Sequence, residues 1–327
     1  MDQQTLNIGT VGTSAIMQQM QEAIRRTPGV TSRVVFSRDA ERGKAFAAAM
    51  GVQASCCDYE EMLNRSDVDA VYIASPNRFH AGQTLQALRH GKHVIVEKPA
   101  ALSAADVQSY IQAARQNGVF FFEAITTIHM PNYLCCKALL PQLGTIRRAK
   151  ICHARYSSKY DAYLRGENPN IFNPEMQAGA LNDMGIYCIH VAVDLFGTPS
   201  KVSYQAEYGL NGIDLAGKLC LEYPTFICEI ETAKNADLQT GCWIEGEQGW
   251  IEAPGRLSVF PPFRALINGQ EQLIDRQPEG ERMVFELSRF RDSIFQRDEA
   301  FFIQMASQSA IAAGILEAAH ATDGLNR

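Results

Sequence analysis

The first 122 residues alternate short apolar runs with amphipathic stretches, and this alternation constrains the fold more than any other feature of the chain. The apolar runs are rich in β-branched or aromatic residues, and the stretches between them carry apolar residues at helical spacing. Strands that alternate with helices predict a parallel, doubly wound α/β sheet. The expected strands are 6–11, 33–36, 70–74, 93–96 and 119–122, and the expected helices are 14–25, 40–50, 80–89 and 104–116.

The pattern changes after Glu123, which predicts a second domain over 123–327 that follows a first domain over 1–122. From 201 to 260, strand-like runs alternate with turn signals such as Asn211-Gly212, so we expect a mostly antiparallel sheet in an α+β domain. The C-terminal helix is a candidate to pack back on the first domain. The other expected elements are helices 132–140, 183–196, 281–295 and 305–319, a strand at 148–156 and an irregular stretch at 157–178.

Composition excludes several classes of protein. A net charge of −6 argues against a nucleic-acid surface, which normally needs clustered Lys and Arg. The chain begins without a basic stretch followed by an apolar segment, and no apolar run approaches the ~20 residues that span a membrane, so we expect a cytoplasmic protein. The nine cysteines include no pair with zinc spacing, which predicts reduced thiols, mostly in the core, and no metal site.

The first expected strand leads into a turn that suits a dinucleotide. A glycine between strand and helix lets the backbone approach a pyrophosphate, which the helix N-terminus stabilises. Against the pattern G-x-G-x-x-G, Gly12 fits, whereas Ser14 and Met17 stand at the second and third glycines. A plain tight turn is the alternative. The expected contacts are made by Gly12, Thr13, Ser14, Ala15 and Ile16.

The residues after the second strand bear on the choice of cofactor. NAD sites usually carry an acidic residue there, whereas an arginine suits the 2′-phosphate of NADP. This chain has Ser37-Arg38, and we expect Asp39 to cap the following helix instead. The pattern therefore favours NADP over NAD, with a solvent-facing Arg38 as the alternative.

Two further segments carry candidate catalytic groups. Lys98 follows a central strand at its carboxyl end, where open α/β sheets bind ligands, and a lysine in a cleft there needs a partner or a task. Asp183 and Tyr187 are four apart on an expected helix and share a face with His190, which predicts a proton-handling group. The alternatives are that Asp183 only favours its helix N-terminus, Tyr187 is a core aromatic, and His190 is a packed histidine.

These motifs make the chain resemble the glucose–fructose oxidoreductase / inositol dehydrogenase (Gfo/Idh/MocA) family over nearly its whole length. The resemblance rests on Ser75-Pro76-Asn77 with His80, on Glu97-Lys98-Pro99, and on the segment 179–187, which reads Gly-Ala-Leu-Asn-Asp-Met-Gly-Ile-Tyr. Within the family, Ser37-Arg38 and Glu123-Ala124 are similar to the branch of dimeric dihydrodiol dehydrogenase.

The resemblance implies a Rossmann domain joined to a substrate-binding domain with a large open sheet, whose face often forms a homodimer or higher homo-oligomer. It implies NADP or NAD, a sugar, polyol or diol substrate, and a cis Lys98–Pro99 peptide bond. Carried over by motif, Lys98, Asp183 and Tyr187 are the catalytic residues. The cofactor residues it adds to the glycine turn and Ser37-Arg38 are Ser75, Pro76, Asn77, His80, Glu97 and Lys98.

One departure from the dihydrodiol branch concerns the substrate. Where that branch often reads Glu-Ala-x-Trp-Thr-Arg, residues 123–128 read Glu-Ala-Ile-Thr-Thr-Ile, so the Trp and the Arg are absent. This weighs against a dihydrodiol substrate. We expect substrate contacts instead from His190 and from residues near the irregular stretch, namely His129, Arg155, Tyr156, Lys159 and Tyr163.

The resulting hypothesis is reversible oxidation of a secondary alcohol. Tyr187 would exchange the hydroxyl proton, and because a free phenol is protonated at neutral pH, the Lys98 cation would have to favour the phenolate. Lys98 as the proton donor is the alternative, and Asp183 would orient one or both. Two other functions stay open at this point: a non-catalytic NADP-binding regulator, and an enzyme that uses a bound nicotinamide transiently.

Overall fold

The computed structural model describes residues 4–278 and 282–324, and the chain divides into two compact units. The first unit contains the described residues of Met1–Ala101, Ala105–Ala124 and Gly280–Ala310, and the second contains those of Leu102–Ala104, Ile125–Glu279 and Ile311–Arg327. The residues that follow the second sheet are therefore shared between the units. A single division at residue 122 does not describe them.

The first unit is built on a six-stranded parallel sheet with the strand order β3-β2-β1-β4-β5-β6. This order reverses direction beside β1, as in dinucleotide-binding α/β folds, and it confirms the predicted doubly wound sheet. The strands are β1 (Leu6–Val11), β2 (Val30–Phe36), β3 (Ala54–Cys56), β4 (Ala70–Ile73), β5 (His93–Glu97) and β6 (Phe121–Ala124).

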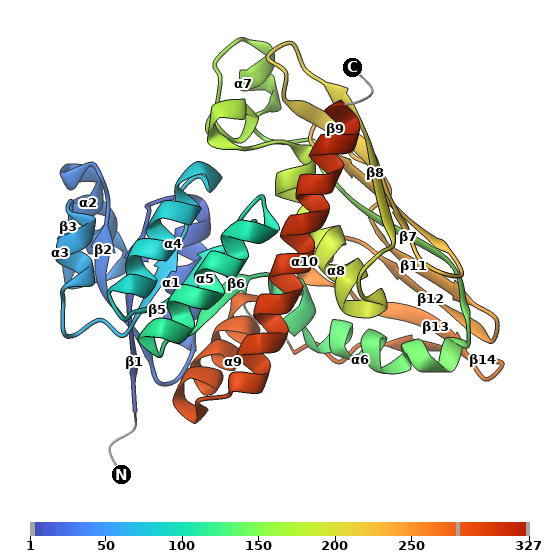
Figure 1. Ribbon diagram of the computed structural model, residues 1–327, viewed down its shortest axis with the longest axis horizontal. Coiled ribbons are helices and arrows are strands. Elements are labelled where there is room, and N and C mark those ends of the chain that lie inside the picture. Colours follow the sequence, from blue (N-terminus) through green and yellow to red (C-terminus); the bar gives the residue numbers. More distant parts are fainter. Residues whose placement is uncertain (1–3, 279–281, 325–327) are drawn as a thin grey trace. The chain divides into compact units, whose positions relative to one another are not determined.

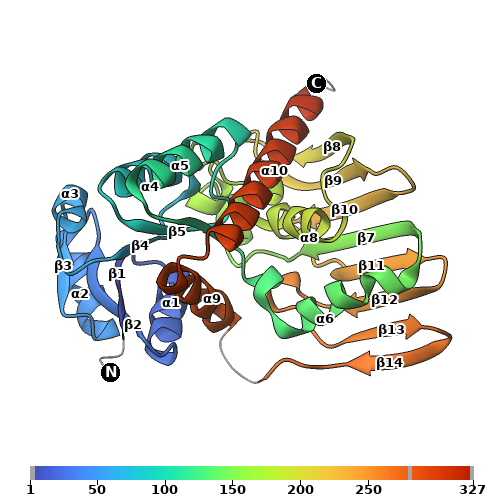
Figure 2. The same cartoon turned by 60° about the horizontal axis from the view of Figure 1, so that its bottom comes forward.

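Helices cover both faces of this sheet. Figure 2 shows α4 (His80–Arg89) and α5 (Ala104–Asn117) on one face, and α1 (Ala15–Arg26) and α9 (Arg282–Gln296) on the other. Phe122 of β6 stacks on Phe290 of α9, with ring centroids 4.7 Å apart, so α9 completes this core. The remaining helices are α2 (Ala40–Met50), the short α3 (Tyr59–Leu63), and the part of α10 (Glu299–Gly324) up to Ala310.

The second unit is built on an eight-stranded sheet with the order β14-β13-β12-β11-β7-β10-β9-β8 (Figure 1). Its neighbouring strands are antiparallel except for β7 and β10, which confirms a mostly antiparallel sheet. The strands are β7 (Ile146–Ala154), β8 (Lys201–Tyr208), β9 (Asp214–Glu222), β10 (Ile227–Ala233), β11 (Gly241–Gly246), β12 (Gly249–Pro254), β13 (Phe263–Ile267) and β14 (Gln270–Ile274).

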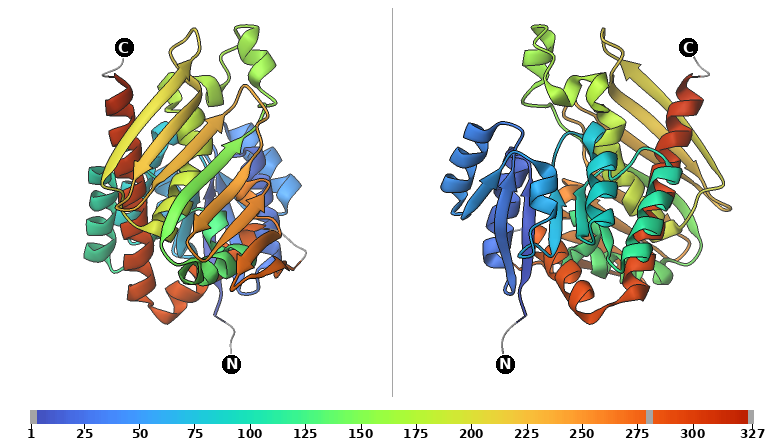
Figure 3. Two further views of the ribbon diagram at one scale, coloured as in Figure 1. Left: turned by 90° about the vertical axis from the view of Figure 1, so that its right-hand side faces the viewer. Right: turned by 60° about the vertical axis from the view of Figure 1, so that its left-hand side comes forward.

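One face of this sheet packs against a π-helical turn, Leu181–Gly185, and the helix α8 (Ile186–Phe196) that continues it. The left view in Figure 3 looks onto the opposite face, where exposed and half-buried side chains alternate with the buried ones along β9 to β13. The other helices of this unit are α6 (Pro131–Leu139), α7 (Tyr160–Leu164) and the last part of α10.

The structure corrects three expectations about elements. Strand β3 and helix α3 were not expected, because β3 is only half-buried and has no apolar run. The expected helix 183–196 begins earlier, at Leu181, and its first turn is π-helical rather than α-helical. The last helix is much longer than 305–319 because its packed side chains extend over both units.

All nine cysteines are free thiols, as predicted. Five of them are buried, and burial raises the pKa of the buried Cys242 thiol to about 12. Within residues 4–278 and 282–324, every helix falls short of the length or the apolarity that a membrane-spanning segment requires.

Candidate active site

The turn between β1 and α1 fits a dinucleotide backbone. Gly12 has φ +109°, and a Cβ atom there would lie 2.9 Å from the carbonyl oxygen of Ala74, so only glycine fits without strain. The Gly12 N–H donates to the carbonyl of Phe36 over 3.0 Å, which ties the turn to β2. The helix N-terminus that follows has no acidic residue in its first turn, so nothing there repels a pyrophosphate.

Ser14 departs from the usual second glycine without structural cost. It is the N-cap residue of α1, with φ −82° and ψ 172°, which any residue adopts. Its side chain is exposed and makes no capping hydrogen bond. Met17, at the third glycine position, is fully buried, so it packs as a core residue of α1. This turn therefore keeps the one glycine that its backbone requires.

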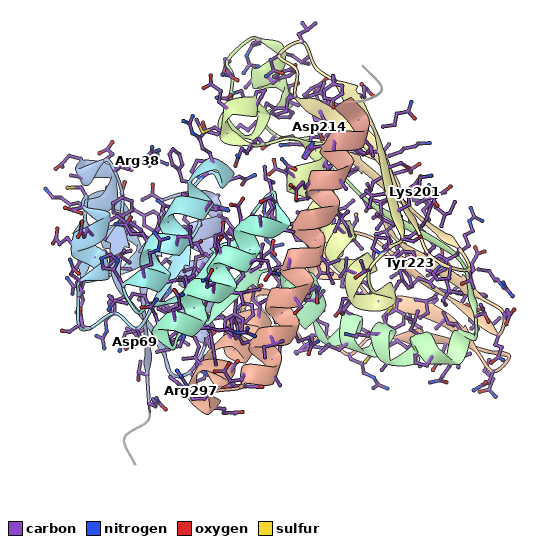
Figure 4. The ribbon with its side chains drawn as sticks, viewed as in Figure 1. Arg38, Asp69, Lys201, Asp214, Tyr223 and Arg297 are labelled. Atoms are coloured by element: carbon purple, nitrogen blue, oxygen red, sulfur yellow. The ribbon has the colours of Figure 1, made fainter. Side chains whose placement is uncertain are left out.

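Arg38 and Asp39 follow β2 and have separate tasks. Asp39 caps α2, because its carboxylate accepts the backbone N–H of Arg42 over 3.0 Å, as predicted. Arg38 is exposed beside α2 (Figure 4), and its guanidinium carbon lies 4.7 Å from the ring centroid of Phe79. The cation is thus supported by an aromatic face at the carboxyl end of the strand, while no carboxylate of this segment is left to bind a ribose.

His80 connects the loops after β4 and β5. Its ring nitrogens lie 2.9 Å from the carbonyl oxygen of Pro99 and 2.8 Å from that of Ser75. The side chain is only 1% exposed, and burial lowers the pKa of the imidazole. The structure therefore gives His80 a bracing role for the Ser75-Pro76-Asn77 loop and the Lys98–Pro99 segment. The Lys98–Pro99 peptide bond is cis, as predicted.

A carboxyl group beside Glu97 was missed by the sequence reasoning. Glu97 is 8% exposed and accepts a 2.5 Å hydrogen bond from the hydroxyl of Tyr72. Glu286 of α9 is 1% exposed, and among the described residues neither of its carboxyl oxygens has a hydrogen-bond partner. Burial, together with the charge of Glu97, raises the pKa of Glu286 well above its usual range. The sequence could have revealed the burial of Glu286, because this residue lies on the apolar face of the helix with Met283 and Phe290.

In the second unit, Asp214 fixes the start of the π-helical turn. Its carboxylate accepts the backbone N–H of Leu181 over 2.7 Å and the hydroxyl of Tyr204 over 2.9 Å. Gly179 is required beside it, since its φ is +129° and a Cβ atom there would overlap the Asp214 carboxylate. Figure 4 marks Asp214 near the start of β9. Burial raises the pKa of this carboxyl.

Asp183 and Tyr187 lie on this turn and on α8, and both are half-buried. Asp183 forms an ion pair with Lys234, which is only 3% exposed and was not singled out from the sequence. The ring of Tyr187 meets the ring of His153 edge to face, with centroids 5.1 Å apart. His153, on β7, is 4% exposed and was also missed, because nothing local to either residue pairs them.

The expected substrate residues are all placed within the second unit, in different environments. His190 is 1% exposed in α8, whereas Arg155 and Lys159 are exposed and His129 is half-buried. Tyr163 stacks on Phe172 with ring centroids 5.1 Å apart. The irregular stretch is therefore organised around a small aromatic core.

The whole chain is similar to known oxidoreductases. Residues 6–125 match the oxidoreductase family with an NAD-binding Rossmann fold, and residues 141–252 match the GFO/IDH/MocA C-terminal domain. The scyllo-inositol 2-dehydrogenase (NADP⁺) IolU of Bacillus subtilis is 37% identical over 246 residues, which cover 75% of each chain. The uncharacterized oxidoreductase YgjR of Escherichia coli is 37% identical over 244 residues, which cover 75% of this chain and 74% of YgjR.

More distant relatives agree in fold. The trans-1,2-dihydrobenzene-1,2-diol dehydrogenase of Mus musculus is 25% identical over 98% of this chain and 97% of its own. A levoglucosan dehydrogenase solved with NADH and levoglucosan has a TM-score of 0.87 at 18% identity, with 99% of this chain and 98% of the other covered. From both domain matches and the close relatives, the chain belongs to the GFO/IDH/MocA family of NAD(P)-dependent oxidoreductases.

Proposed function

We propose that this enzyme transfers a hydride between NADP and a secondary alcohol or carbonyl of a polyol or sugar. The observation that carries the proposal is the half-buried pair Asp183 and Tyr187, which the second unit holds on a π-helical turn anchored by Asp214. π-Helical turns are frequent at functional sites. The NADP-dependent inositol dehydrogenase of Bacillus subtilis, at 37% identity, supports a polyol substrate.

The residues that would hold the cofactor are the Gly12 turn, Ser37-Arg38, and the loop 75–77. Gly12 leaves room for a phosphate backbone that a Cβ atom would fill, and Arg38 offers the cation that a 2′-phosphate needs. When bound, the nicotinamide ring supplies or accepts the hydride. His80 keeps the loop beside Lys98 in place through its contacts with Ser75 and Pro99.

The remaining chemistry is the transfer of one proton. Tyr187 exchanges the hydroxyl proton at its phenol oxygen, and Lys98 is the second proposed catalytic residue. Asp183 keeps the reacting groups oriented. Retention of Lys98, Asp183 and Tyr187 together favours an enzyme over a regulator that only binds the dinucleotide.

The open face of the second sheet is the proposed surface for a homodimer. Trp250 is half-buried on this face, and its ring is covered by Arg264, whose guanidinium carbon lies 5.9 Å from the ring centroid. The face also carries the ion pair between Lys150 and Glu231, at 2.9 Å. Aromatic side chains such as Trp250 are enriched in protein–protein interfaces, whereas the ion pairs suit the polar rim of such a surface.

The test starts from a substrate screen. Inositols, other polyols, sugars and keto sugars are assayed with NADP and NAD by the absorbance of the reduced cofactor. With the best substrate, Tyr187→Phe should lower kcat by about 10²–10⁴-fold while the affinity for NADPH is kept, because only the proton-carrying hydroxyl is lost. Lys98→Met should cause a comparable loss, and the double variant should be little worse than either single one.

Each other outcome identifies what is wrong. If Tyr187→Phe keeps near-full turnover and Lys98→Met is inactive, Lys98 is the proton donor. If both variants stay active, the catalytic group lies elsewhere. A wild-type enzyme that binds NADPH and turns over no polyol or sugar contradicts the substrate class.

A further inference from the structure

Lys234 is a buried cation that the proposed mechanism has not yet used. It follows β10 directly and is 3% exposed, and a lysine so far from water is costly unless its charge is paired. Its ammonium group forms an ion pair with the Asp183 carboxylate and donates a hydrogen bond to the carbonyl of Ile171. It also lies 4.7 Å from the ring centroid of Phe172. The cation is therefore fully engaged by two separate segments.

The sheet fixes the place from which Lys234 acts. In the parallel pair of β7 and β10, Ala154 lies opposite Ala233, so the residues after both strands emerge at the same edge. The backbone N–H of Lys234 donates to the carbonyl of Leu215 over 2.7 Å, and its own carbonyl accepts the N–H of Ser157 over 2.9 Å. Backbone hydrogen bonds at both the N–H and the carbonyl group of Lys234 therefore fix the position of its main chain.

The second partner of Lys234 belongs to the irregular stretch that the sequence connects with substrate binding. Ile171 and Phe172 form the end of a short 3-10 turn, and Phe172 is fully buried. Phe172 packs against Tyr163 and Tyr160, at 5.1 and 5.7 Å between ring centroids. A cation over this ring adds an attraction that strengthens when water is excluded. The aromatic core of the stretch is therefore connected to Asp183 through one ammonium group.

We propose that Lys234 is a positioning residue that sets the Asp183 carboxylate and the Ile171–Phe172 turn in a single arrangement. The inference rests on the proposed function, because it takes Asp183 as part of the catalytic group. Orientation of the carboxylate then depends on contacts inside the second unit. The same cation determines where the aromatic stretch lies, so its loss affects turnover and substrate affinity together.

The first test is Lys234→Met, which removes the charge at similar side-chain length. We expect kcat to fall by about 10²-fold, as small displacements of catalytic groups do, with a raised KM for substrate and an unchanged affinity for NADPH. The matched control is Lys137→Met, which removes a half-buried lysine that pairs with the Asp194 carboxylate in the same unit; its kcat should be that of the wild type.

A second measurement covers variants that fold poorly or lack a known substrate. Unfolding in urea is followed for Asp183→Asn, Lys234→Met and the double variant. Either single change removes one member of the Asp183–Lys234 ion pair and leaves the charge of the other without it. The two effects should therefore not add. The folding equilibrium constant of the double variant should be at least about tenfold larger than the two single effects predict when they are multiplied. Lys234→Gln, which keeps a donor for the Ile171 carbonyl, should recover part of the kcat that Lys234→Met loses.

The outcomes separate this inference from the proposed function. Wild-type kcat in folded Lys234→Met, or a loss of kcat that only equals the loss of folded protein, overturns the positioning role. If Tyr187→Phe abolishes turnover while Lys234→Met does not, the proposed function stands and this inference fails. If Tyr187→Phe is fully active while folded Lys234→Met loses kcat, the role of Tyr187 fails instead. Additive unfolding effects of Asp183→Asn and Lys234→Met contradict the inference without any substrate.

Discussion

At the scale of single residues, the environment decides what each charged group does. Arg38 is exposed, yet its guanidinium rests on the ring of Phe79, which limits where the cation can lie. Asp39, the adjacent residue, is committed to capping α2. The Asp39 carboxylate is directed at the N-terminus of α2, where the helix dipole favours its charge. The cation of Arg38 therefore stays available to a phosphate.

We predict that this chain binds NADPH more tightly than NADH, and that Arg38→Ala removes most of the difference. The expected loss of NADPH affinity is about tenfold or more, since hydrogen bonds to charged groups contribute roughly 1.5–3 kcal/mol. Fluorescence titration of both cofactors against both proteins measures it. Arg42→Ala, an exposed arginine of α2, serves as the control. Equal affinities in the wild type contradict the preference for NADP.

Glu286 gives the first unit a stability that depends on pH. Because burial raises the pKa of its carboxyl in the folded state, the unfolded chain releases this proton at lower pH than the folded chain does. The contribution of Glu286 to stability is therefore fully present below the ordinary glutamate pKa of about 4.3, and it is lost as pH rises toward the raised value.

We predict that Glu286→Gln stabilises the enzyme near neutral pH and has little effect near pH 4. The gap in unfolding free energy should widen with pH by up to about 1.4 kcal/mol per unit, the limit for one proton. Urea unfolding at several pH values measures it, with Glu41→Gln on the exposed face of α2 as control. A gap that does not change with pH would mean that Glu286 is ionised in the fold.

At the scale of elements, the π-helical turn Leu181–Gly185 is held by contacts at its beginning. Asp214 accepts the N–H of Leu181, and Thr232 donates its hydroxyl hydrogen to the carbonyl of Ala180 over 3.0 Å. These contacts come from β9 and β10, so the sheet sets the position of the turn. Helical spacing in the sequence gives no sign of these contacts with the sheet. It therefore predicted a regular α-helix from Asp183 and not a π-helical turn from Leu181.

We predict that Gly179→Ala destabilises the enzyme by about 3 kcal/mol and lowers turnover in the protein that still folds, because a Cβ atom would both strain the backbone and displace Asp214. Gly212→Ala is the matched control. Gly212 also has positive φ, at +79°, but has open space around it, so only the roughly 1–2 kcal/mol of the left-handed backbone applies. Equal losses in both variants would show that the contact with Asp214 is unimportant. Urea unfolding and kcat give both readouts.

At the scale of the whole molecule, each unit carries some of the proposed cofactor-binding or catalytic residues. The first unit has the glycine turn, Arg38 and Lys98, and the second has Asp183, Tyr187 and Lys234. The second unit also carries an eight-stranded sheet of which α8 and the π-helical turn pack on one face. The other face of this sheet carries the half-buried Trp243 and Trp250, and aromatic side chains are enriched in protein–protein interfaces.

We predict that the enzyme is a homodimer and that Trp250→Glu makes it monomeric. The new carboxylate would lie among the half-buried side chains of β11 to β13, where dimer formation would have to remove it from water. Light scattering during gel filtration measures the mass, and Leu210→Glu in an exposed loop is the control. A monomeric wild type, or a dimeric Trp250→Glu variant, rules out this surface.

The sequence by itself predicted the parallel sheet of the first unit and the motifs of its proposed site, but not that α9 belongs to the same unit. Alternating periodicities predict the parallel sheet because strand and helix patterns depend on neighbours a few residues apart. The Asp39 helix cap and the Gly12 turn also depend on residues close in the chain, so both could be predicted from the sequence. The short strand β3 is half-buried and has no apolar run, so its sequence shows neither pattern.

Only the tertiary structure decided which groups meet. The pairs Asp183–Lys234 and Tyr187–His153 join residues far apart in the chain. They depend on the parallel register of β7 and β10, in which a shift by one residue would turn each side chain to the other face. The raised pKa of Glu286 likewise follows from the burial of one face of α9, which comes from the end of the chain. Long-range register and burial leave no local pattern, so no reading of short segments could have supplied them.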